Sequence, residues 1–430
     1  MKKNTAVLLL SVLGMMALTR SASGGDSVDD QVKRLAQRYK QVDDQLGRSI
    51  HYIRKTESLY NGGTTIEQAW FNGAGDLIKV AVERTDSSGR ELTEYFAPDF
   101  DNADDGMFIL TRKETLSSND GTQVDESRQY FDGELIRELR KSARFKPGES
   151  TDTVHVPNVV VDLSKQPKDD RSEGERSQAA YDFFSKPLKI ATTLKEAGPP
   201  DVDPFASVKG DSGKFRVVHG TASPDGRYAI ALGFTREKID WEQLKDSNNP
   251  ATYFAEDYIS DEAGTVDSEY GKLLNYVVDL TTGHILGETG CAFFGTKPRY
   301  NYRACGVSWS PDSQNFVQLT SEKWNYVSCG AGRISAGPKL LGTVDLGKYA
   351  EKNASSYLKT HKHGKYEGSI DIGIDDVTDD GIISLTIYGQ KASGDRKGEL
   401  NFSVAEKIRM RETPAGLRLE TVSVRNAPEE

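Results

Sequence analysis

The sequence predicts a mostly β protein of the α+β class, in which an N-terminal helix and an antiparallel sheet are followed by further antiparallel sheets. Three observations lead to this class. Glycine is frequent, at 40 of 430 residues. Tyr, Phe, Val, Ile and Thr recur in short runs, as is typical of strands. Turn signals such as Asp-Gly and Asn-Asp-Gly separate these runs, which indicates many short strands joined by tight turns.

Residues 1–23 predict a cleaved secretory signal of bacterial type. Lys2 and Lys3 precede an apolar run from Ala6 to Leu18, and small residues follow at 21–23. The run is short for a membrane span, and no Cys near the cleavage region could carry a lipid anchor. No later segment is long and apolar enough to cross a bilayer. We therefore expect a secreted or periplasmic protein without a stable membrane span.

The charge of the mature chain argues against nucleic acid as a partner. Cleavage removes Lys2, Lys3 and Arg20 and no acids, so the 55 basic residues fall to 52 against 65 acidic ones, a net charge of −13. An acidic chain repels phosphate backbones. The remaining length of about 400 residues suits two or three domains.

A helix opens the first expected domain, residues 24–146. Ser27 is the expected N-cap, with Asp30 three residues on and Gly47 as terminator. Apolar side chains recur at steps of three and four and form one stripe. The stripe indicates a helix laid against a sheet, with a short dimerising coiled coil as the alternative. Its members are Val28, Val32, Leu35, Tyr39, Val42 and Leu46.

Seven strands are expected between Ser49 and Ala143, and tight turns separate them. One helix followed by seven such strands predicts a curved antiparallel meander whose face the helix covers. In layout alone this resembles the helix-plus-half-barrel plan of periplasmic lipid or lipoprotein carriers. The expected strands are Ile50–Glu57, Thr65–Phe71, Leu77–Arg84, Glu91–Phe96, Met107–Thr115, Asp125–Tyr130 and Glu134–Lys141.

Residues 147–212 are predicted to be a linker with a short helix. Pro, Asp, Lys, Ser and Glu dominate Ser164–Arg176, a composition typical of linkers. A helix is expected at Ser177–Ser185, and Pro187 follows in the next turn. The Pro-rich segment 198–204 then interrupts regular structure.

A repeated turn marks the last expected domain, residues 213–430. "TASPDGRYAIAL" (221–232) and "SWSPDSQNFVQL" (308–319) align without gaps, and "VTDDGIISLTI" (377–387) is a degenerate third copy. Val-Asp-Leu follows the first two copies, at 278–280 and 344–346. In these turns Pro presets φ, Asp bonds its own backbone, and Gly takes the left-handed corner.

These motifs resemble the blades of secreted β-propellers of the TolB and WD-repeat kind. The resemblance implies propeller-like antiparallel sheets over about 200 residues. Asp225 and Asp312 are 87 residues apart, and Asp312 and Asp380 are 68 apart. At about 40–45 residues a blade, this leaves room for three or four blades, so an incomplete propeller and a closed ring both remain open.

Three cysteines remain in the mature chain: Cys291, Cys305 and Cys329. In an oxidising compartment we expect one disulfide and one free thiol. Cys291–Cys305 is favoured because both lie at the ends of adjacent expected strands, and Cys305–Cys329 is the alternative. A zinc site is disfavoured because no close Cys-x-x-Cys pair is present.

No catalytic, cofactor-binding or metal-ligating residue is assigned from motifs. Asp99–Gly106 and Asp375–Gly381 look like calcium loops, but Arg112 and Ile387 stand where the bidentate Glu belongs. Lysines surround His361 and His363 and would repel a cation. Nucleophile-elbow, Ser-x-x-Lys, P-loop and Rossmann patterns are absent or lack their companion residues.

The loop between Cys291 and Cys305 is the candidate binding element. Aromatic and Arg side chains of this kind bind partners or glycans by stacking and bidentate hydrogen bonds. The alternative is that Phe293 and Phe294 anchor the loop in the core while its cations are solvated. The candidate contacts are Phe293, Phe294, Arg299, Tyr300, Tyr302 and Arg303.

The sequence favours a secreted or periplasmic binding or scaffold protein over an enzyme, because none of the catalytic motifs appears. Its expected partner is a protein or another component of the cell envelope. The alternative is an extracytoplasmic hydrolase whose acidic catalytic residues are dispersed among loops. Converging carboxylates with shifted pKa values in a cleft would favour the hydrolase.

Overall fold

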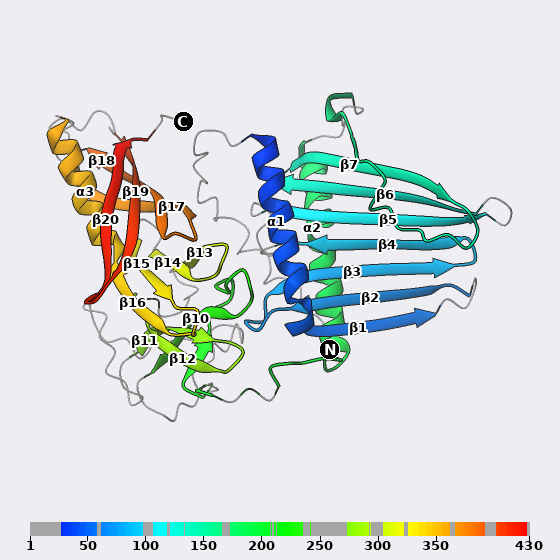
Figure 1. The fold of residues 1–430 in the computed structure, drawn as a ribbon, viewed down its shortest axis with the longest axis horizontal. Helices are drawn as coiled ribbons and strands as arrows, with labels where there is room; N and C mark the ends of the chain where they lie inside the picture. Colours follow the sequence, from blue (N-terminus) through cyan, green and yellow to red (C-terminus); the bar gives the residue numbers. More distant parts are fainter. Residues whose placement is uncertain are drawn as a thin grey trace, which may run out of the picture.

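The computed structural model has two parts, an eight-stranded sheet with two helices and a stack of three four-stranded sheets with a third helix (Figure 1). All four sheets are antiparallel and none closes into a ring among the described residues, so the mostly β class is confirmed. The expected signal at 1–23 lies outside the described residues. These are 27–57, 62–97, 106–117, 121–132, 134–165, 173–206, 208, 210–211, 213–234, 241, 273–291, 293, 304–321, 326–361, 366–391 and 401–427.

The N-terminal sheet is a simple meander, because each strand pairs with its neighbour in sequence. The seven strands expected from the sequence all form, and several run further into their hairpins. Strands β1–β8 are Ile50–Glu57, Thr64–Phe71, Leu77–Asp86, Gly89–Phe96, Met107–Ser117, Gly121–Asp132, Glu134–Phe145 and Val159–Val160.

Helix α1 (Val28–Gln45) covers one face of this sheet, as its apolar stripe predicts. Its N-terminus is capped by Ser27, whose side chain accepts a hydrogen bond from the backbone N–H of Asp30. Leu35 and Val42 are buried against Phe96 and Phe108 of β4 and β5. The alternative of a dimerising helix is therefore not needed to bury the stripe.

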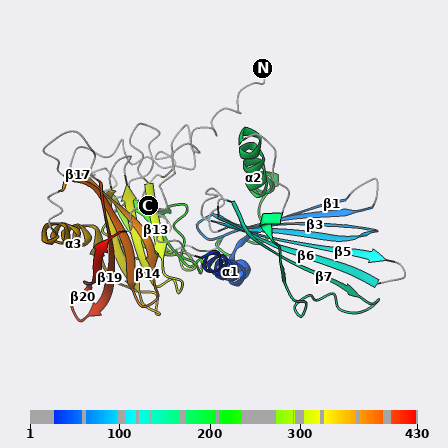
Figure 2. The ribbon, with the colours of Figure 1, turned by 90° about the horizontal axis from the view of Figure 1, so that it is seen from above.

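Helix α2 (Glu173–Ala197) lies on the opposite face (Figure 2). It is 25 residues long and carries Pro187 inside it, so it extends well beyond the short helix expected at Ser177–Ser185. Ala191 and Leu194 pack on apolar side chains of β2–β6. The N-terminal sheet is thus covered on both faces by helices at one end of its strands, and the strands extend beyond them (Figure 1).

The second part is a stack of three sheets, which we call the first, second and third sheets. Helix α3 (Leu346–Thr360) packs against the second and third. The first sheet holds β9 (Phe215–Val217), β10 (Tyr228–Phe234), β11 (Leu273–Asp279) and β12 (His284–Glu288). The second holds β13 (Ala304–Trp309), β14 (Asn315–Ser321), β15 (Tyr326–Ile334) and β16 (Leu340–Asp345). The third holds β17 (Tyr366–Val377), β18 (Ile382–Lys391), β19 (Asn401–Thr413) and β20 (Gly416–Asn426).

Side chains that alternate between the two faces of each strand pack the sheets of the stack against one another. In β10, Ala229 and Ala231 face Phe205 and Ala74 of the N-terminal part, whereas Ile230 faces the second sheet. In β14, Phe316 packs toward the first sheet and Val317 toward the third. Both faces of the first and second sheets are therefore buried, as in propeller blades that pack face to face.

The three repeated turns have the same internal hydrogen bonds. Ser310 Oγ donates to Asp312 Oδ1 at 2.6 Å and accepts from Asn315 N at 2.9 Å. The turn at 223–226 repeats this pattern, and the turn at 378–381 does so with Thr378 in place of Ser and with the backbone donor four residues on instead of five. The fourth turn residue has φ near +60° to +80° in each copy. The degenerate third copy is thus a true repeat of the turn.

The three turns form a row, and we call it the turn row. Asp225 N donates to Ser313 Oγ at 3.1 Å, and Asp312 N donates to Asp379 Oδ1 at 2.8 Å. Each turn is therefore bonded to the next. Side chains at the C-terminal end of α1 donate to backbone carbonyls of this row, in the pairs Gln41–Pro311, Gln45–Pro224 and Arg48–Asp225.

The joint between the two parts has a second contact at the β2–β3 turn. The carboxylate of Asp76 accepts hydrogen bonds from Gly220 N at 3.0 Å and from the ring of His219. Burial alone would raise the pKa of Asp76, but these bonds outweigh it and lower the pKa. Helix α1 and this turn together fix the N-terminal sheet to the stack.

None of the helices in the described part of the chain combines the length and the apolar character that crossing a membrane requires.

Candidate functional site

The base of the predicted binding loop lies between the first and second sheets. Asn275 of β11 holds the backbone of Phe293 by two hydrogen bonds, Nδ2 to the carbonyl oxygen at 2.6 Å and Phe293 N to Oδ1 at 2.7 Å. Gln318 of β14 donates from Nε2 to the same Oδ1 at 2.9 Å. All three residues are buried, so this amide clamp ties one end of the loop to two sheets.

The structure places only one of the six candidate contact residues. The side chain of Phe293 is 4 % exposed, so it anchors the loop in the core and does not offer a surface to a ligand. The other five candidates, Phe294, Arg299, Tyr300, Tyr302 and Arg303, lie outside the described residues. Their part in binding stays a prediction.

The three cysteines are free thiols, and they do not share one surface. Gln318 lies between two of them, because Cys291 Sγ donates to its backbone carbonyl and its Nε2 donates to Cys305 Sγ, both at 3.6 Å. Cys329 belongs to the core on the other side of the second sheet. This arrangement favours Cys291–Cys305 over Cys305–Cys329, although the disulfide stays a prediction.

The thiols are poorly suited to nucleophilic chemistry. Burial raises the pKa of Cys291 to about 11 and that of Cys305 to about 12, and it also raises the pKa of Cys329. Since the thiolate is the reactive form, these groups stay protonated near neutral pH. Cys291 and Cys305 pack near the two ends of the loop, and Cys329 belongs to the core on the other side of the second sheet.

Two buried oxygens near the amide clamp have no hydrogen-bond partner among the described residues. They are Gln318 Oε1 and Thr320 Oγ1, both on β14. A buried polar atom without a partner costs free energy, so a water molecule or a group from the loop would be stabilised here. The amide clamp is thus polar and incompletely bonded.

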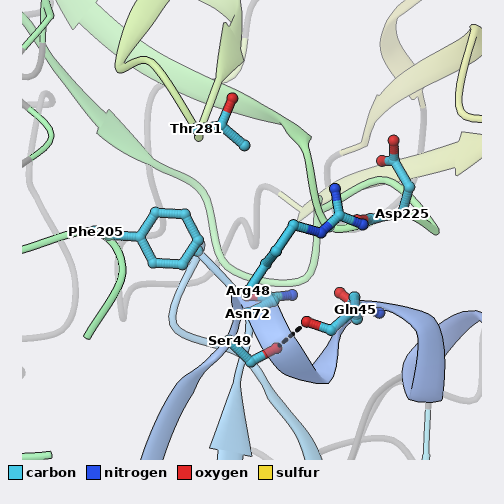
Figure 3. A pocket seen from close by; sticks show the side chains of 9 residues that line it. Gln45, Arg48, Ser49, Asn72, Phe205, Asp225 and Thr281 are labelled. Carbon is cyan, nitrogen blue, oxygen red and sulfur yellow. Dashed lines mark hydrogen bonds between the residues drawn. The ribbon is translucent and has the colours of Figure 1, made fainter. Parts of the chain in front are cut away.

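A small cavity lies at the joint between the two parts of the molecule (Figure 3). Its volume is about 10 Å³, which holds at most one water molecule. Ser49 Oγ donates to the backbone carbonyl of Gln45 at its edge, at 2.9 Å. The cavity is too small for a substrate. It is lined by Gln45, Arg48, Ser49, Asn72, Gly73, Phe205, Asp225, Gly226 and Thr281.

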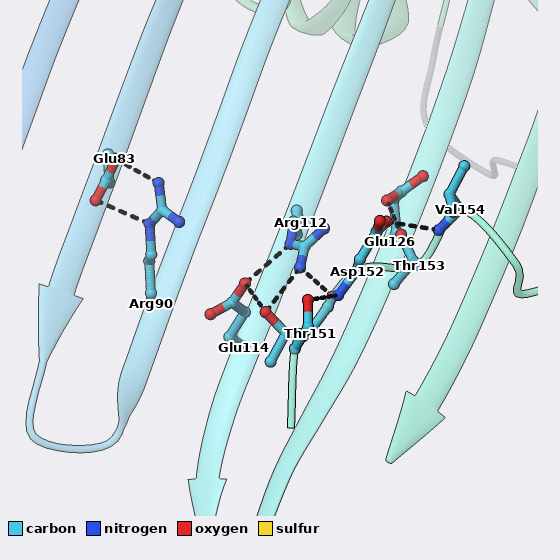
Figure 4. A network of polar contacts seen from close by, with 10 residues as sticks. Glu83, Arg90, Arg112, Glu114, Glu126, Thr151, Asp152, Thr153 and Val154 are labelled. Carbon is cyan, nitrogen blue, oxygen red and sulfur yellow. Dashed lines mark hydrogen bonds and ion pairs between the residues drawn. The ribbon is translucent and has the colours of Figure 1, made fainter. Parts of the chain in front are cut away.

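A ladder of charged side chains covers the N-terminal sheet beyond α1 (Figure 4). Arg90 forms two hydrogen bonds to Glu83, both at 2.8 Å. Thr153 Oγ1 donates to Glu126 at 2.8 Å, and Lys141 donates to the Thr153 carbonyl at 3.0 Å. The ladder therefore fastens the segment after β7 across the sheet. These charges satisfy one another, which indicates a structural role.

The carboxyl groups with raised pKa values do not converge. Burial beneath α3 raises the pKa of Glu406 to about 7, while Asp375 bonds Thr386 and has a raised pKa chiefly through partial desolvation. Residues of β17 to β19 point alternately to opposite faces, and these two carboxyls lie on different faces of the third sheet. They cannot act as a catalytic pair.

The motifs considered for metal binding show no site in the described part of the chain. Asp379 and Asp380 serve the turn row, and most of the other calcium-like loop, 98–105, is outside the described residues. His361 stacks on Tyr357, and His363 is likewise outside. No described group of three or more His, Cys, Asp or Glu side chains is placed to hold a metal ion.

A cationic face on the third sheet was not predicted from the sequence. Basic side chains alternate with apolar ones in Lys407-Ile-Arg-Met-Arg411, and this period of two places them on one side of a strand. β20 adds two more from the same side. The alternation was visible, but only strand pairing shows that the two strands contribute to one surface. We call Lys407, Arg409, Arg411, Arg418 and Arg425 the cationic face.

Neither a protein-family model nor a curated protein sequence matches this chain.

Proposed function

We propose that the protein is a secreted or periplasmic binding or scaffold protein whose sheets form a frame for the loop between Cys291 and Cys305. The amide clamp is the observation that carries this proposal. Three hydrogen bonds of 2.6 to 2.9 Å join Asn275, Phe293 and Gln318 in the interior. The clamp fixes the backbone of Phe293, where the loop begins, and preorganisation of a binding segment favours affinity.

The loop that leaves this base carries aromatic and arginine side chains in sequence. These residue types dominate the energetics of binding surfaces, because they bury large areas or form bidentate hydrogen bonds. The proposed ligand is a protein or another component of the cell envelope. The hydrolase alternative is less well supported, since Glu406 and Asp375 lie apart and the joint cavity holds only a water molecule.

The test compares capture of envelope components by the mature chain and by the double variant Arg299→Ala/Tyr300→Ala. We expect the variant to lose components that the wild type retains, by about tenfold or more, because a pair of such anchors contributes about 2 kcal/mol or more. Purified peptidoglycan and detergent-solubilised envelope extract are the two probes, and mass spectrometry identifies what is retained.

The matched control is Arg84→Ala/Arg144→Ala, which removes two exposed cations from the N-terminal sheet. Its capture should equal that of the wild type, and both variants should keep the wild-type circular dichroism spectrum. Equal capture by the wild type and Arg299→Ala/Tyr300→Ala would rule out the loop as the binding element.

A further inference from the structure

The third sheet ends the stack, and its two faces differ. One face packs against the second sheet and α3 through Ile383, Leu385 and Ile408, all fully buried. The other face, the outer face, alternates with it along the strands. Ser384, Lys407 and Arg409 on this face are polar and partly or fully exposed, while Ile382 and Ala405 are apolar and Thr386 is buried. The first and second sheets have both faces covered, so this outer face is the large sheet face that the stack leaves open.

Within the outer face, the cationic face lies on β19 and β20, which are neighbours at one edge of the third sheet. In register, Arg411 lies opposite Arg418, Arg409 opposite Glu420, and Lys407 opposite Ser423. Alternate residues of a strand are about 7 Å apart and neighbouring strands about 5 Å. The five cations therefore form a row about 20 Å long, from Arg411 and Arg418 at one end to Arg425 at the other, on a chain that is acidic as a whole.

Most of these charges are not neutralised within the protein. Arg411 pairs with Glu420 at 2.7 Å, and Arg409 lies close enough to Asp380 to help lower its pKa. The side chains of Lys407, Arg418 and Arg425 form no hydrogen bond or ion pair with a described residue. Like charges directly opposite on neighbouring strands, as in Arg411 and Arg418, destabilise a sheet. Folding alone does not account for this arrangement.

We propose that the cationic face docks the protein on an anionic phospholipid surface. A flat array of Lys and Arg without a pocket suits a flat array of phosphate groups, which attracts basic side chains additively. Glu420 and Asp380 offset part of this charge at Arg411 and Arg409, and acids more than about 10 Å away are screened at ordinary ionic strength. A second copy meeting face to face is disfavoured, since it would oppose like charges.

The cationic face shares no residue with the loop between Cys291 and Cys305, so the proposal goes beyond the function proposed above. The docking would be peripheral and reversible, since it depends on charge and the outer face offers no apolar side chain comparable to a lipid anchor. High salt should therefore release the protein from the surface.

The experiment is co-sedimentation of the mature protein with phosphatidylcholine vesicles, with and without phosphatidylglycerol. We expect binding only to the anionic vesicles, and about tenfold weaker binding when salt is raised to about 0.5 M. The variant Lys407→Ala/Arg418→Ala/Arg425→Ala removes the three unpaired cations and should weaken binding by about tenfold or more.

The control variant Lys113→Ala/Arg84→Ala/Arg144→Ala makes the same change in net charge on the N-terminal sheet and should bind like the wild type. Equal losses in both triple variants would overturn the proposal, because the effect would then follow net charge and not this face. Binding to soluble polyphosphate but not to vesicles would also overturn it, as would no binding to anionic vesicles. Arg299→Ala/Tyr300→Ala should not alter sedimentation, which separates this test from that of the loop.

Discussion

Ser313 shows how one residue adapts the repeated turn to its neighbour. It has φ +62°, the only positive φ of a non-glycine residue in the described part of the chain. The corresponding residues of the other two turns, Gly226 and Gly381, adopt this conformation without a Cβ penalty. Ser313 is fully buried, and its Oγ accepts the hydrogen bond from Asp225 N. The hydroxyl thus offsets the strain of the left-handed backbone.

Replacing Ser313 should separate the contribution of its hydrogen bond from the strain of its left-handed backbone. Ser313→Ala keeps the strain and loses the acceptor, so we expect a loss of about 1–2 kcal/mol in the free energy of unfolding. Ser313→Gly also loses the acceptor but relieves the strain, and should cost less. Urea denaturation of both variants measures the difference. Equal losses would mean that the backbone at 313 is not strained.

At the scale of elements, the third sheet and α3 enclose a carboxyl group. Glu406 of β19 is 1 % exposed, and Asn353 of α3 donates to its Oε2 at 3.1 Å. Its Oε1 has no partner among the described residues. Burial raises the pKa of this carboxyl from 4.5 to about 7, since desolvation disfavours the charged form. The packing of α3 on the third sheet is therefore coupled to protonation of the Glu406 carboxyl group.

This coupling predicts the direction of a pH dependence. The folded pKa is above the unfolded one, so the contribution of Glu406 is fully favourable below pH 4.5 and is lost as the pH rises to about 7. The loss is on the order of 2–3 kcal/mol. Glu406→Gln should remove it, giving a variant more stable than the wild type above pH 7 and similar to it near pH 4.5.

Thermal unfolding between pH 4.5 and pH 8 measures this difference. Glu412→Gln is the control, because Glu412 is an exposed residue of the same strand. Profiles of the wild type and Glu406→Gln that run parallel across this range would show that Glu406 does not carry the proton.

Elements with a strong local signal could be predicted from the sequence. The stripe of α1, the seven N-terminal strands and the Ser-Pro-Asp turns depend on spacing within a few residues, and all of them form. Helix α2 was underestimated because Pro187 indicates an end, whereas packing of Ala191 and Leu194 on the sheet stabilises the helix beyond it. The amide clamp could not be predicted, since it joins residues 18 and 43 positions apart across two sheets.

At the scale of the whole molecule, the joint decides whether the two parts move as one. Its polar bonds from α1 to the turn row are 3.2 to 3.5 Å long and mostly exposed, so each contributes little. The apolar contact is more important. Phe205 packs with Ala74 and Leu280, and a Cβ on Gly73 would come within 2.7 Å of its ring.

Removing this ring should therefore uncouple the parts. Phe205→Ala is expected to lower the stability of the joint by about 2 kcal/mol and to split a single calorimetric transition into two. Phe183→Ala is the control, because Phe183 lies on α2, partly exposed and in tilted ring contact with Phe131 of the N-terminal part. It should shift one transition without splitting it. An unsplit transition in Phe205→Ala would place the coupling elsewhere.

The turn row also bears on assembly. The three sheets are joined by hydrogen bonds from turn to turn, and they do not close into a ring among the described residues. Nothing in such an arrangement limits the number of sheets that can be stacked. Another molecule's layer could in principle be added, and repeated addition would give a filament. Here Ala74 and Phe205 pack on one side of the first sheet, and the arginines and lysine of the cationic face repel a further copy at the other end of the stack. The same charges that attract an anionic surface would thus keep the protein from polymerising.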